Sequence, residues 1–322
     1  MAILILNIGS QTIKWAVYNR QWKEEGNIAI TNFDSQLKDI LNKIRKKYSI
    51  NLIAHRIVHG GERKNCFVDL KLMKYLESLE KFATLHQKYE LKGIKASGKI
   101  FNNAKQAAIF DTSFHSTIPE KAKIYAIPYK FYEKGIKRYG FHGSSHRYVS
   151  EKVSELMKRK NFRLVSCHLG AGCSVTAIEN GKSVDTSMGF TPMEGIMMLT
   201  RSGSIDPGII IYLKNENLNE ILNEKSGIYG ICGQKNFRKV LKSKNKKAKL
   251  AIEMFCYSAA KQIGAYASVM KGLDAVAFTG GIGENSGLVR KKILDYIKFL
   301  KPKVFIIKAD EKEIMLKEAL KL

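Results

Sequence analysis

The sequence predicts an α/β protein made of two similar halves. Three short apolar runs are expected to be strands, and each ends at a glycine-containing turn: Ile3–Leu6, Leu164–Cys167 and Ala275–Phe278. Helix-like stretches lie between them, and strands that alternate with helices are typical of α/β architectures. At 322 residues the chain is also long enough for about two domains.

The remaining elements follow in order. Met1–Leu6 lacks a basic leader and runs directly into Asn7–Ser10, so we expect a first strand that enters a tight turn, not a signal peptide. Helices are predicted over the stretches Ser145–Lys158, Ala248–Val269 and Leu288–Leu300. A short strand, Val304–Ile307, and a charged amphipathic helix that begins near residues 309–312 complete the chain. No apolar run approaches the ~20 residues that a membrane-spanning helix needs.

An internal repeat supports the two halves. An offset of 161 positions aligns Asn7 with His168, Gly9 with Gly170, Ala16 with Ala177, Val17 with Ile178 and Asn19 with Asn180. In both segments an apolar strand, a glycine turn and a second strand lead to a polar hairpin tip. Small residues in such a turn let backbone N–H groups approach a phosphate closely. The repeat therefore suggests a duplicated domain with a nucleotide held in the cleft between the copies, and we place the boundary near residues 144–146.

Composition restricts the possible functions. The 55 basic and 29 acidic residues give a net charge of +26, which could attract nucleic acid. The basic clusters are dispersed and lack interleaved aromatic residues, so solvated basic faces are the favoured interpretation. The five cysteines are scattered and have no CxxC spacing. This pattern argues against a disulfide framework or a zinc site and fits a reducing cytoplasm.

Polar clusters contain all of the histidines, which favours a shared site over separate structural roles. The histidines are His55, His59, His86, His115, His142, His146 and His168. Arg56, close to paired glycines, suits a planar fork that holds a carboxylate or phosphate, although an exposed arginine in a surface turn would look the same. Asp111 follows a strand-like run, where it could orient a nucleophile, hold a metal or cap a helix.

Three further segments carry candidate chemistry. His142 lies between glycines and could contact a transferring phosphoryl group, while the serines that follow it are explained equally well as helix caps. Arg201 is the strong anion binder of a long polar stretch, residues 185–207, whose lack of periodicity predicts a site loop. The glycines of 280–283 precede a helix, where they could seat an anion or adenosine. The chain lacks the P-loop signature, so any nucleotide is bound by another design.

Together these segments closely resemble the acetate kinase family, part of the actin- and hexokinase-like ATPase superfamily. The resembling motifs, in the order of that family, are LILNIGS, HRIVHGGE, FDTSFH, RYGFHGSSH, CHLGAG, DTSMGFTPMEG, TRSGSIDP and GGIGENSG. The resemblance covers nearly the whole chain. It implies two duplicated ribonuclease-H-like domains with an interdomain cleft: residues 1–145 with a C-terminal helix, 309–322, for the acyl substrate, and residues 146–308 for the nucleotide.

The resemblance also implies a reaction and its residues. It implies reversible, magnesium-dependent (or manganese-dependent) in-line phosphoryl transfer from ATP to acetate, giving acetyl phosphate and ADP, in a cytoplasmic homodimer. Asp111, His142 and Arg201 match the catalytic groups, Arg56 the substrate-carboxylate arginine, and Asn7 and Glu311 the metal-associated positions. The acyl pocket matches Val58, Leu85, Phe141 and Pro192. The nucleotide contacts match Lys14, His168, Leu169, Gly170, Ala171, Gly172, Asn236, Phe237, Arg238, Gly281, Ile282, Gly283, Glu284 and Asn285.

Several departures leave alternatives open. The chain looks short for the family, Ala171 stands where asparagine is usual, Asn236 stands where aspartate is typical, and the usual Asn-Pro after His86 is missing. These changes bear on nucleotide affinity and rate more than on the type of reaction. A propionate or butyrate kinase, a catalytically weakened nucleotide-binding relative and a nucleic-acid-binding relative are the alternatives.

Overall fold

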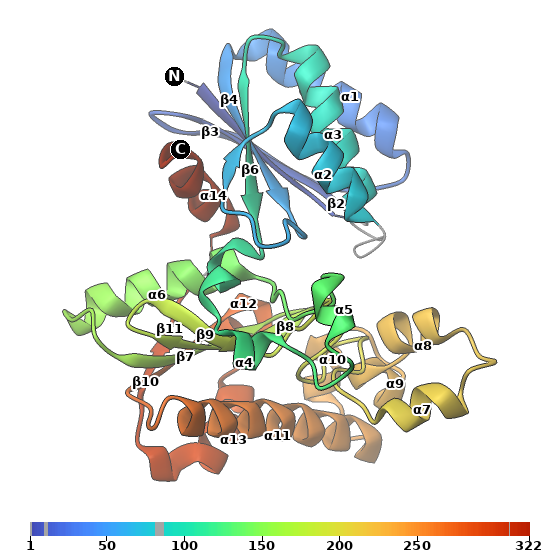
Figure 1. Ribbon diagram of the computed structural model, residues 1–322, viewed down its shortest axis with the longest axis vertical. Helices are drawn as coiled ribbons and strands as arrows, with labels where there is room; N and C mark the ends of the chain where they lie inside the picture. Colours follow the sequence, from blue (N-terminus) through green and yellow to red (C-terminus); the bar gives the residue numbers. More distant parts are fainter. Residues whose placement is uncertain (1, 10–11, 81–86, 309) are drawn as a thin grey trace. The chain divides into compact units, whose positions relative to one another are not determined.

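The computed structural model describes residues 2–9, 12–80, 87–308 and 310–322. The chain forms two compact units, Met1–Ser116 with Asp310–Leu322, and Thr117–Ala309. Each unit contains one β-sheet with helices packed on it (Figure 1). The predicted functional domains, divided at residue 145, stay a prediction, because compactness does not test which residues bind which substrate.

The sheet of the first unit has the strand order β3-β2-β1-β4-β6-β5. Its strands are β1 (Ala2–Ile8), β2 (Thr12–Asn19), β3 (Gln21–Ala29), β4 (Ile50–Ile57), β5 (Cys66–Phe67) and β6 (Lys105–Phe110). β1, β4 and β6 run parallel, whereas β2 and β3 extend the sheet in antiparallel register. Because neighbouring parallel strands end at the same edge, the residues at the carboxyl ends of β1, β4 and β6 lie close together.

Helices cover both faces of this sheet (Figure 1). Leu4 and Leu6 of β1 pack in a core with α1 (Phe33–Lys47), whereas Ile3 and Ile5 pack in a second core with α14 (Glu311–Leu320). Burial on both faces is why β1 is continuously apolar from Ala2 to Leu6 instead of alternating. The other helices of the unit are α2 (Leu70–Ser78) and α3 (Gln87–Ile100). The C-terminal helix therefore belongs to the same unit as the N-terminal strand.

The sheet of the second unit has the order β11-β10-β7-β8-β9. Its strands are β7 (Arg163–Leu169), β8 (Cys173–Glu179), β9 (Lys182–Thr186), β10 (Ala275–Thr279) and β11 (Lys303–Ile306). Figure 1 shows α6 (Gly143–Met157) on one face, with α11 (Lys246–Val269) and α13 (Gly287–Ile297) on the other. The shorter helices are α4 (Glu120–Lys123), α5 (Lys130–Glu133), α7 (Pro207–Tyr212), α8 (Leu218–Glu224), α9 (Gly227–Cys232), α10 (Phe237–Lys242) and α12 (Gly280–Asn285). The described residues also contain the 3₁₀ turns Ser113–Thr117, where the first unit passes into the second along the chain, and Lys298–Leu300 in the second unit.

The two sheets share one plan, which confirms the predicted α/β class and its duplication. In each, three consecutive antiparallel strands are followed by two strands that extend the sheet in parallel on the other side of the first strand. The first sheet has in addition the two-residue strand β5, antiparallel to β6 at the edge. The hairpin tips lie where the repeat predicts them. Arg20 has a φ of 62°, and Asn180 and Gly181 have φ values of 53° and 78°. In the second hairpin, positive φ at both central residues gives the turn that matches the twist of a β-hairpin.

Most predicted elements are confirmed, with small shifts at their ends. The strand predicted over 304–307 is β11, one residue earlier, and the helix predicted over 288–300 ends as α13 at Ile297, before a 3₁₀ turn. The glycines at 280–283 do not merely precede a helix but form α12 themselves. Residues 187–206 contain no helix or strand, as the missing periodicity predicts. In the part of the chain that the structure describes, no helix is long and apolar enough to cross a membrane.

Candidate active site

Arg56 and Asp111 form the centre of the site in the first unit. Arg56 lies near the end of β4 and Asp111 directly follows β6, the next parallel strand. The guanidinium donates through Nε to Oδ1 at 3.1 Å and through Nη2 to Oδ2 at 2.6 Å. Asp111 is buried, whereas a quarter of the Arg56 side chain (25%) remains exposed. The two-point contact therefore fixes the orientation of a guanidinium that can still reach a second anion.

Three more predicted residues join this centre. Nη1 of Arg56 donates to Oδ1 of Asn7 at 3.2 Å, and Nδ2 of Asn7 donates to Oε2 of Glu311 at 2.7 Å. Nζ of Lys14 lies 3.5 Å from the same carboxylate. Asn7 is the penultimate residue of β1, Lys14 faces it across the β1–β2 register, and Glu311 opens α14. The structure thus brings the two predicted metal residues together, with Nδ2 of Asn7 toward Glu311 and Oδ1 of Asn7 toward Arg56. A carboxylate and an amide oxygen are donors of the type that magnesium prefers.

The charge of Arg56 is secured by its neighbours. Burial works against the charged form, but the carboxylates of Asp111 and Glu311 more than offset this effect and raise the pKa of the guanidinium. Arg56 is therefore a permanent cation in a partly buried setting, where it attracts an anion more strongly than it would in water.

Glu90 also belongs to this group, although it was not among the predicted site residues. Its side chain is only 2% exposed, and both carboxylate oxygens lie 3.2 Å from the backbone nitrogen of Val58. A signal for it was present, because the buried residues Gln87, Glu90, Leu91 and Ile94 follow the spacing of one helix face. An acidic residue within an apolar helical stripe is the feature that could have identified it.

His142 is the centre of a second group, in the second unit. It precedes α6 with a φ of 57° and a ψ of 23°, a left-handed conformation that non-glycine residues rarely adopt. Its ring stacks on that of His168, with ring centroids 4.3 Å apart, and Nδ1 lies 2.9 Å from Oγ of Ser174. Nδ1 of His168 in turn lies 2.9 Å from Oγ of Ser145. The imidazole of His142 is thus held in place from two sides.

Arg201 lies beside His142. A Cβ added to Gly172 would be 3.4 Å from Nη1 of Arg201 and 3.5 Å from Cε1 of His142, so this glycine lies between the two side chains. Nη1 of Arg201 also donates to the carbonyl of Pro192 at 3.2 Å. Burial lowers the pKa of Arg201, and the Cys173 thiol opposes this only in part. Among the described residues Arg201 has no carboxylate partner, so it is a half-buried cation suited to an anionic ligand.

A partly buried ionic network holds the loop that carries Arg201 and Pro192. Arg138 donates through Nη2 to Oε1 of Glu194 at 2.7 Å and through Nη1 to the carbonyl of Thr186 at 2.9 Å. The Tyr125 hydroxyl donates to the other oxygen of Glu194, and the amide of Phe190 donates to that hydroxyl at 2.8 Å. These residues fix both ends of the 187–194 segment, although the sequence alone did not indicate this role.

Two of the three predicted nucleotide segments lie together. Residues 168–172 comprise the end of β7 and the turn into β8, and 281–285 belong to α12, which follows the adjacent parallel strand β10. Gly280 has a φ of 77°, and a Cβ there would meet the carbonyl oxygen of Leu169 at 2.7 Å. Only glycine allows α12 to begin this close to the turn. In contrast, Asn236 caps α10, and no hydrogen bond among the described residues joins 236–238 to the other two segments.

The predicted acyl pocket is only partly described. Val58 follows β4 in the first unit and is 8% exposed. Leu85 lies outside the described residues, and Phe141 and Pro192 belong to the second unit. The pocket as a whole therefore stays a prediction.

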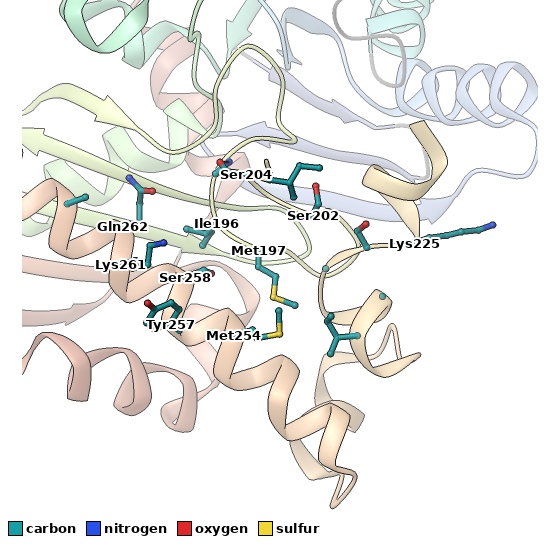
Figure 2. Close-up of a pocket in the computed structure, with 17 residues that line it drawn as sticks. Ile196, Met197, Ser202, Ser204, Lys225, Met254, Tyr257, Ser258, Lys261 and Gln262 are labelled. Atoms are coloured by element: carbon teal, nitrogen blue, oxygen red, sulfur yellow. Dashed lines mark hydrogen bonds between the residues drawn. The ribbon is translucent and has the colours of Figure 1, made fainter. Parts of the chain in front are cut away.

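A separate cavity of about 840 Å³ lies between residues 195–205 and helices α9 and α11 (Figure 2). Ile196 and Met197 line it from the loop, and Met254 and Tyr257 line it from α11. None of the predicted site residues lines this cavity. It is therefore distinct from both groups described above.

Sequence comparison decides the family. The sequence profile of the Acetokinase family matches residues 5–315. The chain belongs to the acetokinase family. It is 47% identical over 271 residues to the acetate kinase of Carboxydothermus hydrogenoformans, and the aligned region covers 80% of this chain and 68% of the relative. It is 43% identical over 320 residues to the acetate kinase of Campylobacter jejuni subsp. jejuni, and here the aligned region covers 92% of this chain and 81% of the relative.

Solved structures agree. A propionate kinase from Francisella tularensis superimposes with a TM-score of 0.91 at 34% identity, and the match covers 100% of this chain and 99% of the propionate kinase chain. The acetate kinase of Porphyromonas gingivalis has a TM-score of 0.90 at 30% identity and covers 99% of each chain. These matches confirm the family, the fold class and the acetate kinase activity that the motifs predict, in a family that uses ATP.

Proposed function

We propose that the protein transfers the terminal phosphoryl group of ATP to acetate, reversibly and by direct in-line displacement. The observation that supports this most strongly is the Arg56–Asp111 pair, a partly exposed guanidinium fixed by a buried carboxylate. A protein that only binds ATP has no need for such a carboxylate site. Acetate is ionised at neutral pH, so its oxygen attacks the phosphorus atom without a general base.

The bonds of the reaction are simple. An oxygen of acetate forms a bond to the terminal phosphorus, the bond from that phosphorus to the bridging oxygen breaks, and the electron pair leaves with ADP. Arg56 holds the attacking carboxylate and Asp111 orients Arg56. His142 and Arg201 stabilise the negative charge on the equatorial oxygens as the phosphoryl group is transferred. Positioning and charge neutralisation thus supply the rate.

Asn7 and Glu311 would hold a magnesium (or manganese) ion, with Lys14 near the nucleotide phosphates. The described residues contain no group of three or more His, Cys, Asp or Glu side chains that could hold a metal. A site of one carboxylate and one amide oxygen suits magnesium, which keeps several water ligands and binds substrate phosphates. When bound, the ion would neutralise charge on the nucleotide phosphates.

The nucleotide would be held by the turn at 168–172, by α12 and by residues 236–238. The first two lie together at the carboxyl ends of β7 and β10, where α/β sheets bind ligands. Ala171 stands where the family usually has asparagine, so a weakened nucleotide site is the alternative. The intact hydrogen bonding of Arg56, Asp111 and His142 supports an active enzyme instead.

Acetate is the proposed acid, with Val58, Leu85, Phe141 and Pro192 around its methyl group. A propionate or butyrate kinase is the second candidate, and the structural similarity to a propionate kinase favours testing it. An extra methylene in such a pocket changes binding by only ~1–3 kcal/mol. A series of short-chain acids would rank the substrates.

We also propose a homodimer in the cytoplasm. Apolar side chains are exposed on α7, where Tyr212 is 88% and Ile211 is 73% exposed, and such residues fit an interface between copies. The five cysteines are unpaired, which fits a reducing compartment. Sedimentation of the full chain would show twice the monomer mass, and a monomer would contradict this part of the proposal.

The decisive experiment is trapping of acetyl phosphate as a hydroxamate from ATP, magnesium and acetate. Acetate-dependent product is expected for the wild type, and a large loss is expected for Arg201→Ala. Arg45→Ala is the matched control, because Arg45 is an exposed arginine at the end of α1. If no short-chain acid gives product while ATP still binds, the proposed activity is wrong.

A further inference from the structure

A buried carboxyl group with no assigned role lies beside the substrate arginine. Glu90 is on the inner face of α3 and is 2% exposed. Both of its oxygens lie 3.2 Å from the backbone nitrogen of Val58, the residue two positions after Arg56. The charged groups that act on it are Arg56 on β4 and Asp111 after β6. Glu90 is thus connected by a hydrogen bond to the end of β4 and by charge to the pair that carries the proposed chemistry.

The contact has a structural consequence. Val58 follows the last residue of β4, where the N–H can no longer join the sheet. A buried N–H without a partner is costly, so Glu90 fixes the backbone at the point where Arg56 and the Val58 side chain enter the site. A glutamine could accept the same hydrogen bond. The carboxyl group therefore adds something that the hydrogen bond does not require, namely a charge that can change.

We propose that Glu90 is a positioning residue that fixes Val58 beside Arg56 and whose charge sets how tightly Arg56 binds the carboxylate substrate. This inference rests on the proposed function, because it needs an anionic substrate on Arg56. Asp111 already neutralises the charge of Arg56, and the carboxylate of Glu311 also acts on the charge of Arg56. Ionised Glu90 would be a third carboxylate near Arg56 and would lower the attraction for an incoming anion.

The charge of Glu90 changes in an accessible pH range. Burial raises its pKa to about 8; the Val58 N–H and Arg56 oppose this shift, while Asp111 adds to it. Glu90 is therefore mostly neutral near neutral pH and ionised in mild alkali. Acetate is ionised throughout this range, so only the protein changes charge.

The test compares Michaelis constants for acetate and ATP between about pH 6.5 and 9.5 in the wild type, Glu90→Gln and Glu90→Ala. For the wild type, the KM for acetate is expected to rise at least about threefold across this range while the KM for ATP changes little. Glu90→Gln is expected to match the wild type at the lower pH and to lose the rise. Glu90→Ala, which leaves the Val58 N–H without its acceptor, is expected to have a raised KM for acetate at every pH.

Glu318→Gln is the matched control, since Glu318 is also buried, at 5% exposed. Its carboxylate accepts a hydrogen bond from Nδ2 of Asn65 at 2.8 Å and not from the Val58 backbone. The control should retain the wild-type pH profile. If Glu90→Gln retains it as well, the inference is wrong. Failure of the proposed function would look different, because the wild type itself would then give no acetate-dependent product.

A binding measurement on the wild type keeps the inference testable if the variants fail to fold. The probe is acetate alone, and the readout is the rise in Tm that it produces. We expect acetate to raise Tm less at about pH 9 than at about pH 7, because ionised Glu90 weakens the site. An equal rise at both pH values would overturn the inference.

Discussion

Ser174 places its hydroxyl oxygen 2.9 Å from Nδ1 of His142. The same oxygen lies 2.7 Å from Nε2 of His146, whose Nδ1 lies 2.9 Å from Oγ of Ser166. A serine hydroxyl has one proton, so it can donate to only one of the two rings. If Ser174 donates to Nδ1 of neutral His142, then Nε2 of His142 carries the proton and can donate to a phosphoryl oxygen. In that arrangement Nε2–H of His146 donates to Ser174 and Ser166 donates to Nδ1 of His146, so the Ser166–His146–Ser174 chain would orient His142 and set its tautomer.

Ser174→Ala is expected to lower kcat about ten- to a hundredfold with little change in the KM for acetate, because His142 loses its tautomer control. Nitrogen NMR of the His142 ring should show a changed tautomer in the variant. Ser150→Ala is the control, because Ser150, on α6, is also a buried serine, at 4% exposed. An unchanged ring spectrum in Ser174→Ala would contradict the assignment.

Arg56→Lys is expected to reduce kcat/KM for acetate on the order of a hundredfold, since an ammonium cannot make the two-point contact with Asp111 and still reach the substrate. The KM for ATP should stay nearly unchanged. Arg163→Lys offers a matched comparison, because Arg163 makes a similar fork to Asp274 with two contacts of 3.1 Å. Equal losses in both variants would show that the effect is general destabilisation.

Glu311→Gln is expected to raise the magnesium concentration needed for half-maximal activity by about tenfold, and excess magnesium should restore most of kcat. The residue contacts Asn7 and lies near Lys14, so losing its charge weakens a cation site without removing the oxygen donor. Glu313→Gln, two residues further along α14, pairs with Lys317 and should behave like the wild type. A variant that stays inactive at any magnesium concentration would argue for a different role.

Burial of the neutral His55 side chain is expected to make the protein less stable in acid. Burial lowers the pKa of His55 to about 4, while its hydrogen bond to Gln106 works in the opposite direction. A histidine with a depressed folded-state pKa contributes stability that is present above its unfolded pKa, about 6.5, and is lost progressively as the pH falls from there to about 4. The loss amounts to about 1.4 kcal/mol per pH unit for each such histidine.

Urea unfolding between about pH 4 and 7 checks this prediction. His55→Asn should reduce the slope of the unfolding free energy against pH by the contribution of one proton, about 1.4 kcal/mol per pH unit. His59, whose pKa burial also lowers to about 4, should supply a similar remaining slope. An unchanged slope in the variant would mean that His55 is charged or exposed in the folded protein.

The sequence alone determined those features that depend on neighbours along the chain. The apolar runs set β1, β7 and β10, and the Asn180-Gly181 pair set a hairpin tip because these residues tolerate positive φ. The repeat at an offset of 161 predicted two sheets of one plan. The residue types of Arg56 and Asp111, and their places after strand-like runs, indicated an anion-binding site with a nearby carboxylate.

Only the tertiary structure decided which of these residues meet. Asn7 and Glu311 are 304 positions apart, and their hydrogen bond exists because α14 packs on the same sheet that begins with β1. The spacing of α3 could place Glu90 on an inner face, but nothing local shows that this face lies beside Val58 and Arg56. The same holds for Ser174 between His142 and His146. Local pattern fixes the direction in which a side chain points, whereas its partner depends on the packing of segments far apart in sequence.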